Sequence, residues 1–186
     1  MGRWLRIPAC AAVIALLSCG GPHARRAITE TRTVKPPAGL EAPAPSSPYT
    51  WAAPDGWVEA RPRPVRLVTF EVGPAAEAEC YVTVLGGDGG GVGLNVNRWR
   101  EQMGLDPLGG EAVAELPTIT LAGREAPWVE LTGAYQGMRG EARPDWMLLG
   151  AVALLEEEAV FVKMVGPEAV VRGERDGFIA FCGSLK

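Results

Sequence analysis

The chain has 186 residues, of which 47% are hydrophobic and 22% charged, and its formal net charge is −4. This length suits one domain with a tail. The acidic balance excludes a generic basic nucleic-acid binder, so we expect no nucleic-acid partner. A single His and four scattered Cys leave too few ligands for a zinc site or a His-based catalytic triad. We therefore expect no bound metal and no cofactor.

Residues 1–18 have the organisation of a secretory signal. Arg3 and Arg6 form a positively charged start, and an apolar run of eleven residues follows over 7–17. A transmembrane helix needs about 20 apolar residues, so this run is too short to remain as a permanent anchor. The pattern predicts that residues 1–18 are a signal peptide, and the residues at its end indicate which kind.

The apolar run ends in Leu16-Leu17-Ser18-Cys19, which resembles the lipobox of bacterial lipoproteins. In that family the peptide is cut before the Cys, whose thiol receives a diacylglyceryl group. The resemblance implies a lipid on Cys19 that anchors the exported protein to the cell envelope without spanning the membrane. Gly20 follows, where an Asp often signals retention in the inner membrane, so the resemblance favours the periplasmic face of the outer membrane. The alternative is an ordinary secreted protein.

Residues 19–48 predict a disordered tether that begins with the lipidated Cys. Six Pro are spread among Ala, Ser and Gly, with no apolar periodicity. The single His, His23, lies here and is therefore given no catalytic or ligand role. The first 50 residues carry a net charge of +4 and the remaining 136 carry −8. A single acidic domain is expected over residues 49–186.

The first half of this domain predicts two strands and a helix. Alternating apolar residues predict strands over 65–72 and 78–85. The glycine-rich residues 86–93 then break the chain. Apolar residues at helical spacing predict a helix that begins near Leu94 and stops at Gly104.

The second half predicts a hairpin, two long strands and a last helix. The expected elements are strands over 118–121 and 128–131 that turn at Gly123-Arg124, an exposed loop over 136–145, strands over 146–155 and 159–165, and a helix over 168–185. The last two strands are almost continuously apolar, which predicts cover on both faces. The fold class is α+β, with a mostly antiparallel sheet of about six strands, a central helix and a C-terminal helix.

This order of elements resembles the PsbP-like α/β/α sandwich. The resemblance covers residues 49–186 and includes the opening Trp51-x-x-Pro-x-Gly-Trp57 and a helix that carries Asn95-Val-Asn-Arg-Trp99. It implies an extrinsic subunit of a membrane complex or a binding module, similar to small envelope lipoproteins of this pattern. No metal ligand or catalytic residue is carried over from the family.

Asn95, Arg98 and Gln102 form the candidate partner- or ligand-binding site. Helical spacing places them on one face, opposite the apolar stripe of the same helix. Arg and Asn side chains make directional polar contacts, so this face suits recognition of a partner. The alternative is that these residues cap and solvate the helix or bond the glycine-rich loop.

Three other features have simpler interpretations. The glycine-rich loop lacks the Lys-Ser/Thr of a P-loop and predicts a flexible connection. Three consecutive carboxylates at 156–158 predict a solvated tip and not a cation site. Five Trp side chains could line an aromatic ligand cleft, but packing in the core is the favoured interpretation. These residues are Trp51, Trp57, Trp99, Trp128 and Trp146.

The mature domain keeps two Cys, Cys80 and Cys182, both on apolar faces. Export permits a disulfide between them. Such a bond would close a loop of about 100 residues and stabilise the fold by up to about 4–5 kcal/mol. Two separately buried thiols are the slightly favoured alternative, because free Cys packs well in cores.

These features favour a lipid-anchored envelope protein with a non-catalytic binding or scaffolding domain. Its expected partners are the membrane, through the lipid on Cys19, and an envelope protein. The alternative is a tethered hydrolase that acts on wall or glycan material through paired carboxylates. That alternative predicts a deep pocket with an Asp/Glu pair of raised pKa.

Overall fold

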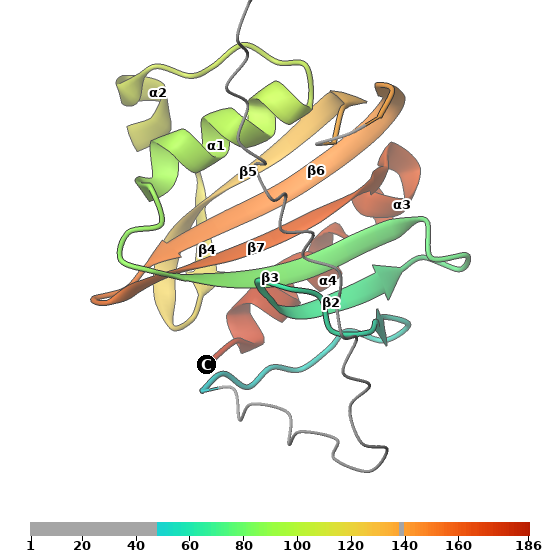
Figure 1. The fold of residues 1–186 in the computed structure, drawn as a ribbon, viewed down its shortest axis with the longest axis horizontal. Helices are drawn as coiled ribbons and strands as arrows, with labels where there is room; N and C mark the ends of the chain where they lie inside the picture. Colours follow the sequence, from blue (N-terminus) through green and yellow to red (C-terminus); the bar gives the residue numbers. More distant parts are fainter. Residues whose placement is uncertain (1–47, 138–139) are drawn as a thin grey trace, which may run out of the picture. The chain divides into compact units, whose positions relative to one another are not determined.

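The computed structural model describes residues 48–137 and 140–186. The predicted signal peptide, Cys19 and almost all of the predicted tether lie outside the described residues. The elements are β1 (Val58–Glu59), β2 (Arg66–Val72), β3 (Ala78–Gly86), α1 (Gly91–Gln102), α2 (Gly110–Ala114), β4 (Thr118–Leu121), β5 (Arg124–Tyr135), β6 (Arg143–Leu154), β7 (Glu158–Pro167), α3 (Glu168–Gly173) and α4 (Arg175–Ser184) (Figure 1). Among these, no helix is both long and apolar enough to cross a membrane.

The strands form one sheet in the order β1-β2-β3-β7-β6-β5-β4, and every neighbouring pair is antiparallel. This confirms the predicted α+β class with a mostly antiparallel sheet. The sheet has seven strands where about six were expected, because β1 is only two residues long and shows no alternation. The almost continuously apolar β6 and β7 lie at the centre of the sheet, as their composition predicts.

Helices α3 and α4 cover one face of the sheet. Phe178, Phe181 and Cys182 of α4 are fully buried there, in one cluster with Cys80 and Val82 of β3. The ring of Phe181 has its centroid 5.3 Å from that of Phe70 and 5.4 Å from that of Trp57. We call this face, whose core is buried and apolar, the sealed face.

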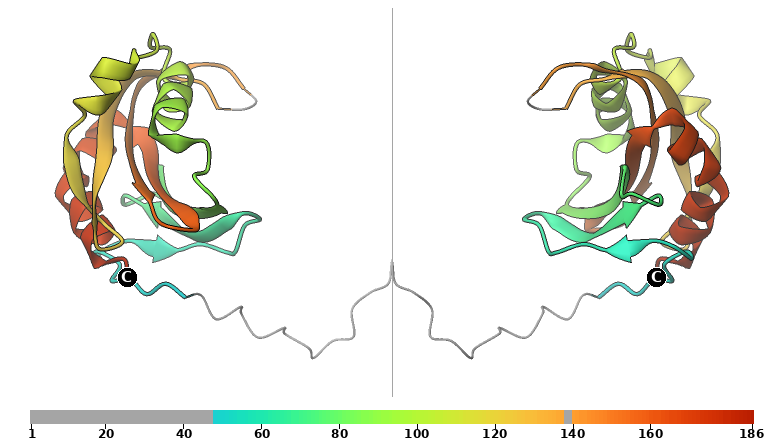
Figure 2. Two further views of the ribbon diagram at one scale, coloured as in Figure 1. Left: turned by 90° about the vertical axis from the view of Figure 1, so that its left-hand side faces the viewer. Right: turned by 90° about the vertical axis from the view of Figure 1, so that its right-hand side faces the viewer.

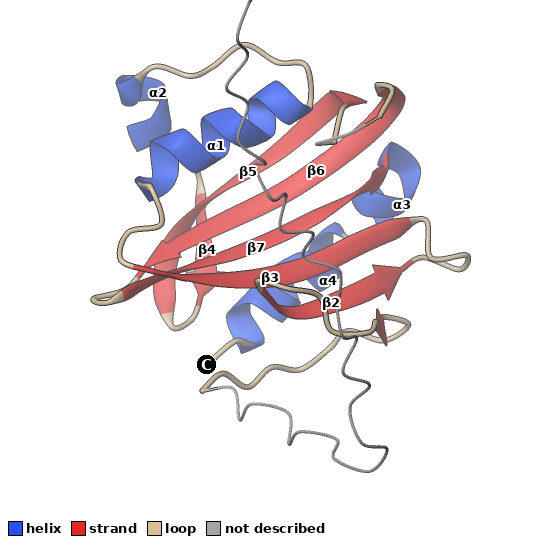
Figure 3. Cartoon of the chain, viewed as in Figure 1, coloured by secondary structure: helices blue, strands red, loops and turns tan. Residues whose placement is uncertain are grey.

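Helix α1 lies on the other face, over β5 and β6 (Figure 3). A Cβ on Gly150 of β6 would lie 2.3 Å from the ring of Trp99, so this glycine lets the indole pack directly on the sheet. Gly133 of β5 plays the same part for the end of α1, since its Cβ would meet the carbonyl of Met103 at 2.2 Å. Two glycines thus set how closely the helix approaches.

The sheet curves around α1, with α3 and α4 on its outer side (Figure 2). Irregularities in register interrupt β2 between Arg66 and Val68 and β5 between Gly133 and Tyr135. Such bulges bend the strand that carries them. No described helix covers β2 and β3 on the α1 side. We call this uncovered part of the face, with the adjoining part of β7, the open face.

The predicted last helix is two helices. Glu174 has φ −95° and ψ 7°, and it ends α3 and begins α4. Its Oε2 accepts a hydrogen bond from Trp57 Nε1 at 2.9 Å. The break allows Val171 before it and Phe178 after it to be buried in the same core. Flanking glycines at 173 and 177 make the helix easy to interrupt.

Several boundaries also differ from the prediction. Helix α1 begins at Gly91 and not near Leu94, and β5 covers Arg124–Tyr135 where a strand over 128–131 is predicted. The connection expected over 136–145 is shorter, because β6 already begins at Arg143. Helix α2 replaces part of an expected irregular link. None of the five residues of α2 is buried. Because the helix needs no apolar face, its sequence shows no apolar periodicity that would predict it.

Candidate functional site

The three predicted site residues line one cavity. Asn95, Arg98 and Gln102 of α1 border a space of about 170 Å³ between this helix and the open face. The other lining residues are Tyr81, Thr83, Leu85, Trp99, Phe161 and Lys163. We call this cavity the polar groove. The structure therefore brings the predicted residues together and adds partners from β3 and β7.

One detail of the prediction is wrong. The three residues are not opposite the apolar stripe of α1 but about a quarter of a turn away from it, at 100° per residue. Asn95 is buried, with 4% of its surface exposed, whereas Arg98 is exposed. The polar side of α1 therefore lies beside its contact with the sheet, so that Asn95 is buried while Arg98 is exposed to solvent.

Asn95 ties the glycine-rich turn to the helix. Its Nδ2 donates to the carbonyl oxygens of Gly89 at 3.0 Å and Gly91 at 2.7 Å. Its Oδ1 accepts a hydrogen bond from Arg98 Nη1 at 3.2 Å. Gly89 and Gly91 both have positive φ, a conformation that favours glycine. The contact with the loop, which was the structural alternative for Asn95, is thus present, and the same residue also orients Arg98.

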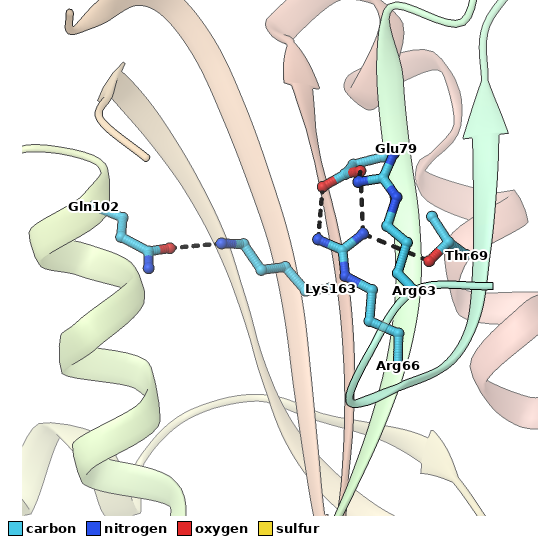
Figure 4. A network of polar contacts seen from close by, with 6 residues as sticks. All are labelled: Arg63, Arg66, Thr69, Glu79, Gln102 and Lys163. Carbon is cyan, nitrogen blue, oxygen red and sulfur yellow. Dashed lines mark hydrogen bonds and ion pairs between the residues drawn. The ribbon is translucent and has the colours of Figure 1, made fainter. Parts of the chain in front are cut away.

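Lys163 is the buried charge of the site. It points from β7 toward α1, where its Nζ donates to Gln102 Oε1 at 2.5 Å, and 4% of the residue is exposed (Figure 4). Its Nζ also lies 5.3 Å from the ring centroid of Tyr135. Burial lowers the pKa of Lys163 to about 8; the charge of Glu79 opposes this shift and that of Arg66 adds to it.

Glu79 of β3 is held by two arginines. Its carboxylate accepts two hydrogen bonds from Arg66, at 3.0 and 3.1 Å, and one from Arg63 at 3.0 Å (Figure 4). Burial raises the pKa of Glu79, but the hydrogen bonds and charge of Arg66, with smaller contributions from Arg63 and Lys163, outweigh it and lower the pKa overall. Arg63 and Arg66 therefore compensate the negative charge of Glu79.

Aromatic rings accompany these charges. The guanidinium of Arg66 lies 3.7 Å from the ring centroid of Tyr81, a contact typical of cation–π pairs. Burial raises the pKa of Tyr81 to about 12, although Arg66 acts against the shift. Tyr135 stacks on Trp146 with centroids 5.2 Å apart and an interplanar angle of 6°. The open face is thus polar and aromatic, in contrast to the sealed face.

A second cavity, of about 380 Å³, lies beside the groove. Glu79, Tyr135, Arg143 and Trp146 are among its lining residues. Arg143 has its guanidinium 4.8 Å from the ring centroid of Trp146. Glu71 and Glu77 also line this space, so its charges are mixed, whereas no carboxylate lines the polar groove.

The five predicted Trp do not form one cleft. Trp57 and Trp128 are buried on the sealed face, where Trp128 stacks on Phe178 at 6.4 Å. Trp99 and Trp146 belong to the other face. Core packing, the favoured interpretation, therefore describes the buried ones. Trp51 packs against the sealed core while partly buried.

Two further predictions concern acidic residues and thiols. Glu158, in the predicted solvated tip, accepts a hydrogen bond from the Tyr49 hydroxyl. In residues 48–137 and 140–186, no cluster of His, Cys, Asp and Glu is arranged to hold a metal ion. Cys80 and Cys182 are free thiols buried in one core, and burial raises the pKa of both.

Sequence reasoning missed Lys163 and Glu79. The signal for Lys163 was present, because it is the one charged residue in the apolar run over 159–165. A buried Lys in such a run marks a position with a specific environment. Glu79 and Tyr81 lie on the polar side of β3, but their neighbours on β7 are distant in the chain and leave no local pattern.

Comparison with known proteins gives likenesses of fold only. No family model and no curated protein matches the chain. A solved structure from Bacteroides thetaiotaomicron is similar with a TM-score of 0.44 and 10% identity over 74% of this chain. The match spans 44% of that protein, less than half its length. Cyanobacterial PsbP (CyanoP) from Synechocystis is similar with a TM-score of 0.44 and 14% identity, covering 74% of this chain and 85% of its own. No site or ligand is transferred from either structure.

Proposed function

We propose that this protein is a lipid-anchored envelope protein whose folded domain is a non-catalytic binding module for an envelope protein partner. The sequence before the domain supports export and lipidation at Cys19. The domain supports binding through its open face, which presents directional polar groups beside aromatic rings.

The observation that carries this proposal is the contrast in cover. Lys163 is buried in the central strand β7 beside α1, and Glu79 lies on the neighbouring β3, where no described helix covers the sheet on this side. A charged group buried in a sheet destabilises the fold unless another group pairs with it, and a protein keeps such a group where it has a function. A face that keeps them, beside a cavity, is the part of the domain best suited to recognition.

The structure favours binding over the hydrolase alternative. That alternative needs two carboxyl groups, one of them with a raised pKa to act as a general acid. Glu79 lines the larger cavity, and the charges of Arg66 and Arg63 lower its pKa. An acid held in this way accepts hydrogen bonds and is a poor proton donor.

Site-specific photo-crosslinking tests the binding role. A photoreactive residue at Thr83, which lines the groove, is compared with the same residue at Asp176, which is exposed on α4. In envelopes of the source cells we expect a reproducible protein adduct from position 83 and none from position 176. No adduct at position 83, or the same adducts at both positions, would contradict the proposal.

Lipidation is tested separately. Cells that express the full chain are fed a fatty-acid analogue, and Cys19→Ala is expected to abolish its incorporation and to release the protein from the membrane fraction. Cys10→Ala is the matched control within the same segment and is expected to leave labelling intact. Undiminished labelling of Cys19→Ala would refute a lipid at this position.

A further inference from the structure

The charges of the polar groove are uncompensated within it. The 136 residues from position 51 onward carry a net charge of −8, yet the groove is lined by two cations, Arg98 and Lys163, and by no Asp or Glu. Within the described residues neither cation forms an ion pair. The groove is therefore positively charged although the domain as a whole is acidic.

Both cations are held by neutral oxygens. Lys163 donates to the amide oxygen of Gln102, and Arg98 donates to that of Asn95. An ammonium group has three N–H donors and a guanidinium has five, so these bonds leave donors for another acceptor. Glu79, whose charge acts on Lys163, already accepts three hydrogen bonds from Arg63 and Arg66.

The remaining lining residues suit an anion as well. Thr83 and Tyr81 add hydroxyl groups, and Trp99 and Phe161 add apolar ring surface to the cavity. Hydrogen bonds between charged donors and oxyanions are the strong ones in proteins. The volume of about 170 Å³ has room for a group of a few heavy atoms, since a water molecule occupies about 30 Å³.

We propose that the polar groove binds a small oxyanion group, a carboxylate or a phosphate, through Lys163 and Arg98. This inference rests on the proposed binding function and names the chemical group that the open face recognises. Gln102 and Asn95 are positioning residues, because they orient the two cations and leave them charged.

Lysine-selective NMR of the mature chain tests the proposal. The sequence has only three lysines, Lys35, Lys163 and Lys186, so the ε-methylene signals are readily assigned. Sodium phosphate and sodium acetate are titrated separately at pH 7 and constant ionic strength, with sodium chloride as the third arm. We expect a saturable shift of the Lys163 signal with phosphate, with acetate or with both, while Lys186 does not move.

Variants show whether the groove itself is responsible. Lys163→Met and Arg98→Gln are each expected to weaken the binding at least tenfold, followed by backbone amide shifts. Arg124→Gln removes the same charge at the start of β5, outside the groove, and is expected to bind normally. Arg98 is exposed, so its variant keeps the test valid if the buried Lys163→Met fails to fold.

The arms decide the outcome. A response to phosphate alone assigns a phosphate group, and a response to acetate alone assigns a carboxylate. An equal response to chloride, or no saturable shift at Lys163, overturns the anion site. Adducts at position 83 together with such a negative result would leave the binding module standing and remove only the anion. Saturable binding without adducts would do the reverse.

Discussion

The two faces of the sheet use the same strands for opposite purposes. On β3, Cys80 and Val82 face a buried apolar core closed by α4, whereas Glu79, Tyr81 and Thr83 line the cavities of the other side. Strand alternation therefore divides one segment into a half that packs in the core and a half that lines the cavities. We expect the sealed face to contribute most of the stability and the open face, which holds the charged groups, to contribute less.

The largest effect is expected on the sealed face. Phe181→Ala removes a fully buried ring that contacts Trp57 and Phe70, and should lower the free energy of unfolding by about 3–5 kcal/mol. Urea denaturation measures the loss. Thr83→Ala on the open face is the matched comparison and should cost less than about 1 kcal/mol. Similar losses for both variants would remove the distinction between the faces.

The next effect concerns the buried charge of the open face. The folded protein releases the Lys163 proton near pH 8, whereas the unfolded chain holds it until about 10.5, so unfolded chains bind more protons between these values. The Lys163 contribution to stability therefore rises with pH over this window, by about 3 kcal/mol in all. Lys163→Met should be the more stable protein at pH 7, and its advantage should disappear toward pH 10.5.

Other groups also titrate in this range, so the difference between the two proteins is the quantity to measure. Glu79, Arg66 and Tyr135 face Lys163 from neighbouring elements, and the buried thiols lower the stability of both proteins above about pH 9. Lys186→Met controls for the loss of an exposed lysine. A difference in the free energy of unfolding between Lys163→Met and the unchanged protein that stays constant from pH 7 to 10.5 would show that burial does not lower the pKa of Lys163.

A smaller effect is expected where α1 meets the sheet. Gly150→Ala places a methyl group against the Trp99 ring and should lower the free energy of unfolding by about 1–3 kcal/mol through overpacking. Gly123→Ala changes a glycine of φ +72° with nothing within 4 Å, and so tests backbone strain without a clash. Thermal unfolding compares the two. An unchanged melting temperature for Gly150→Ala would mean that α1 lies farther from β6.

The smallest effect on stability is expected from a cysteine substitution that compares the reactivity of thiols on the two faces. In a mature chain with Cys19→Ala, the native thiols Cys80 and Cys182 should resist a disulfide reagent at pH 8, because both are buried and their pKa values are raised. Thr83→Cys, introduced on the open face, should react at once. Rapid native reaction of Cys80 or Cys182 would show that the sealed face opens.

Much of the fold follows from local pattern. Alternation located β2 and β3, and the continuous apolar runs located β6 and β7 with cover on both faces. The break at Glu174 was not predicted, because the apolar stripe continues through it, and the hydrogen bond from Trp57 to Glu174 joins residues far apart in the chain.

The candidate site was predictable in part. Helical spacing grouped Asn95, Arg98 and Gln102, since all three lie on one element. Lys163 completes the groove from β7, whose pairing with Tyr81 of β3 joins segments far apart in the chain. Such non-local pairing follows from the whole sheet and is absent from any short stretch of sequence.

The pKa of the Lys163 ammonium, measured by NMR titration of its ε-methylene signal with and without saturating phosphate or acetate, tests the account most directly. We expect a pKa of about 8 in the free protein and a clear rise toward 10.5 when the oxyanion is bound, because the anion stabilises the charged form. An ordinary value near 10.5 in the free protein, or a value that neither anion raises, would contradict it.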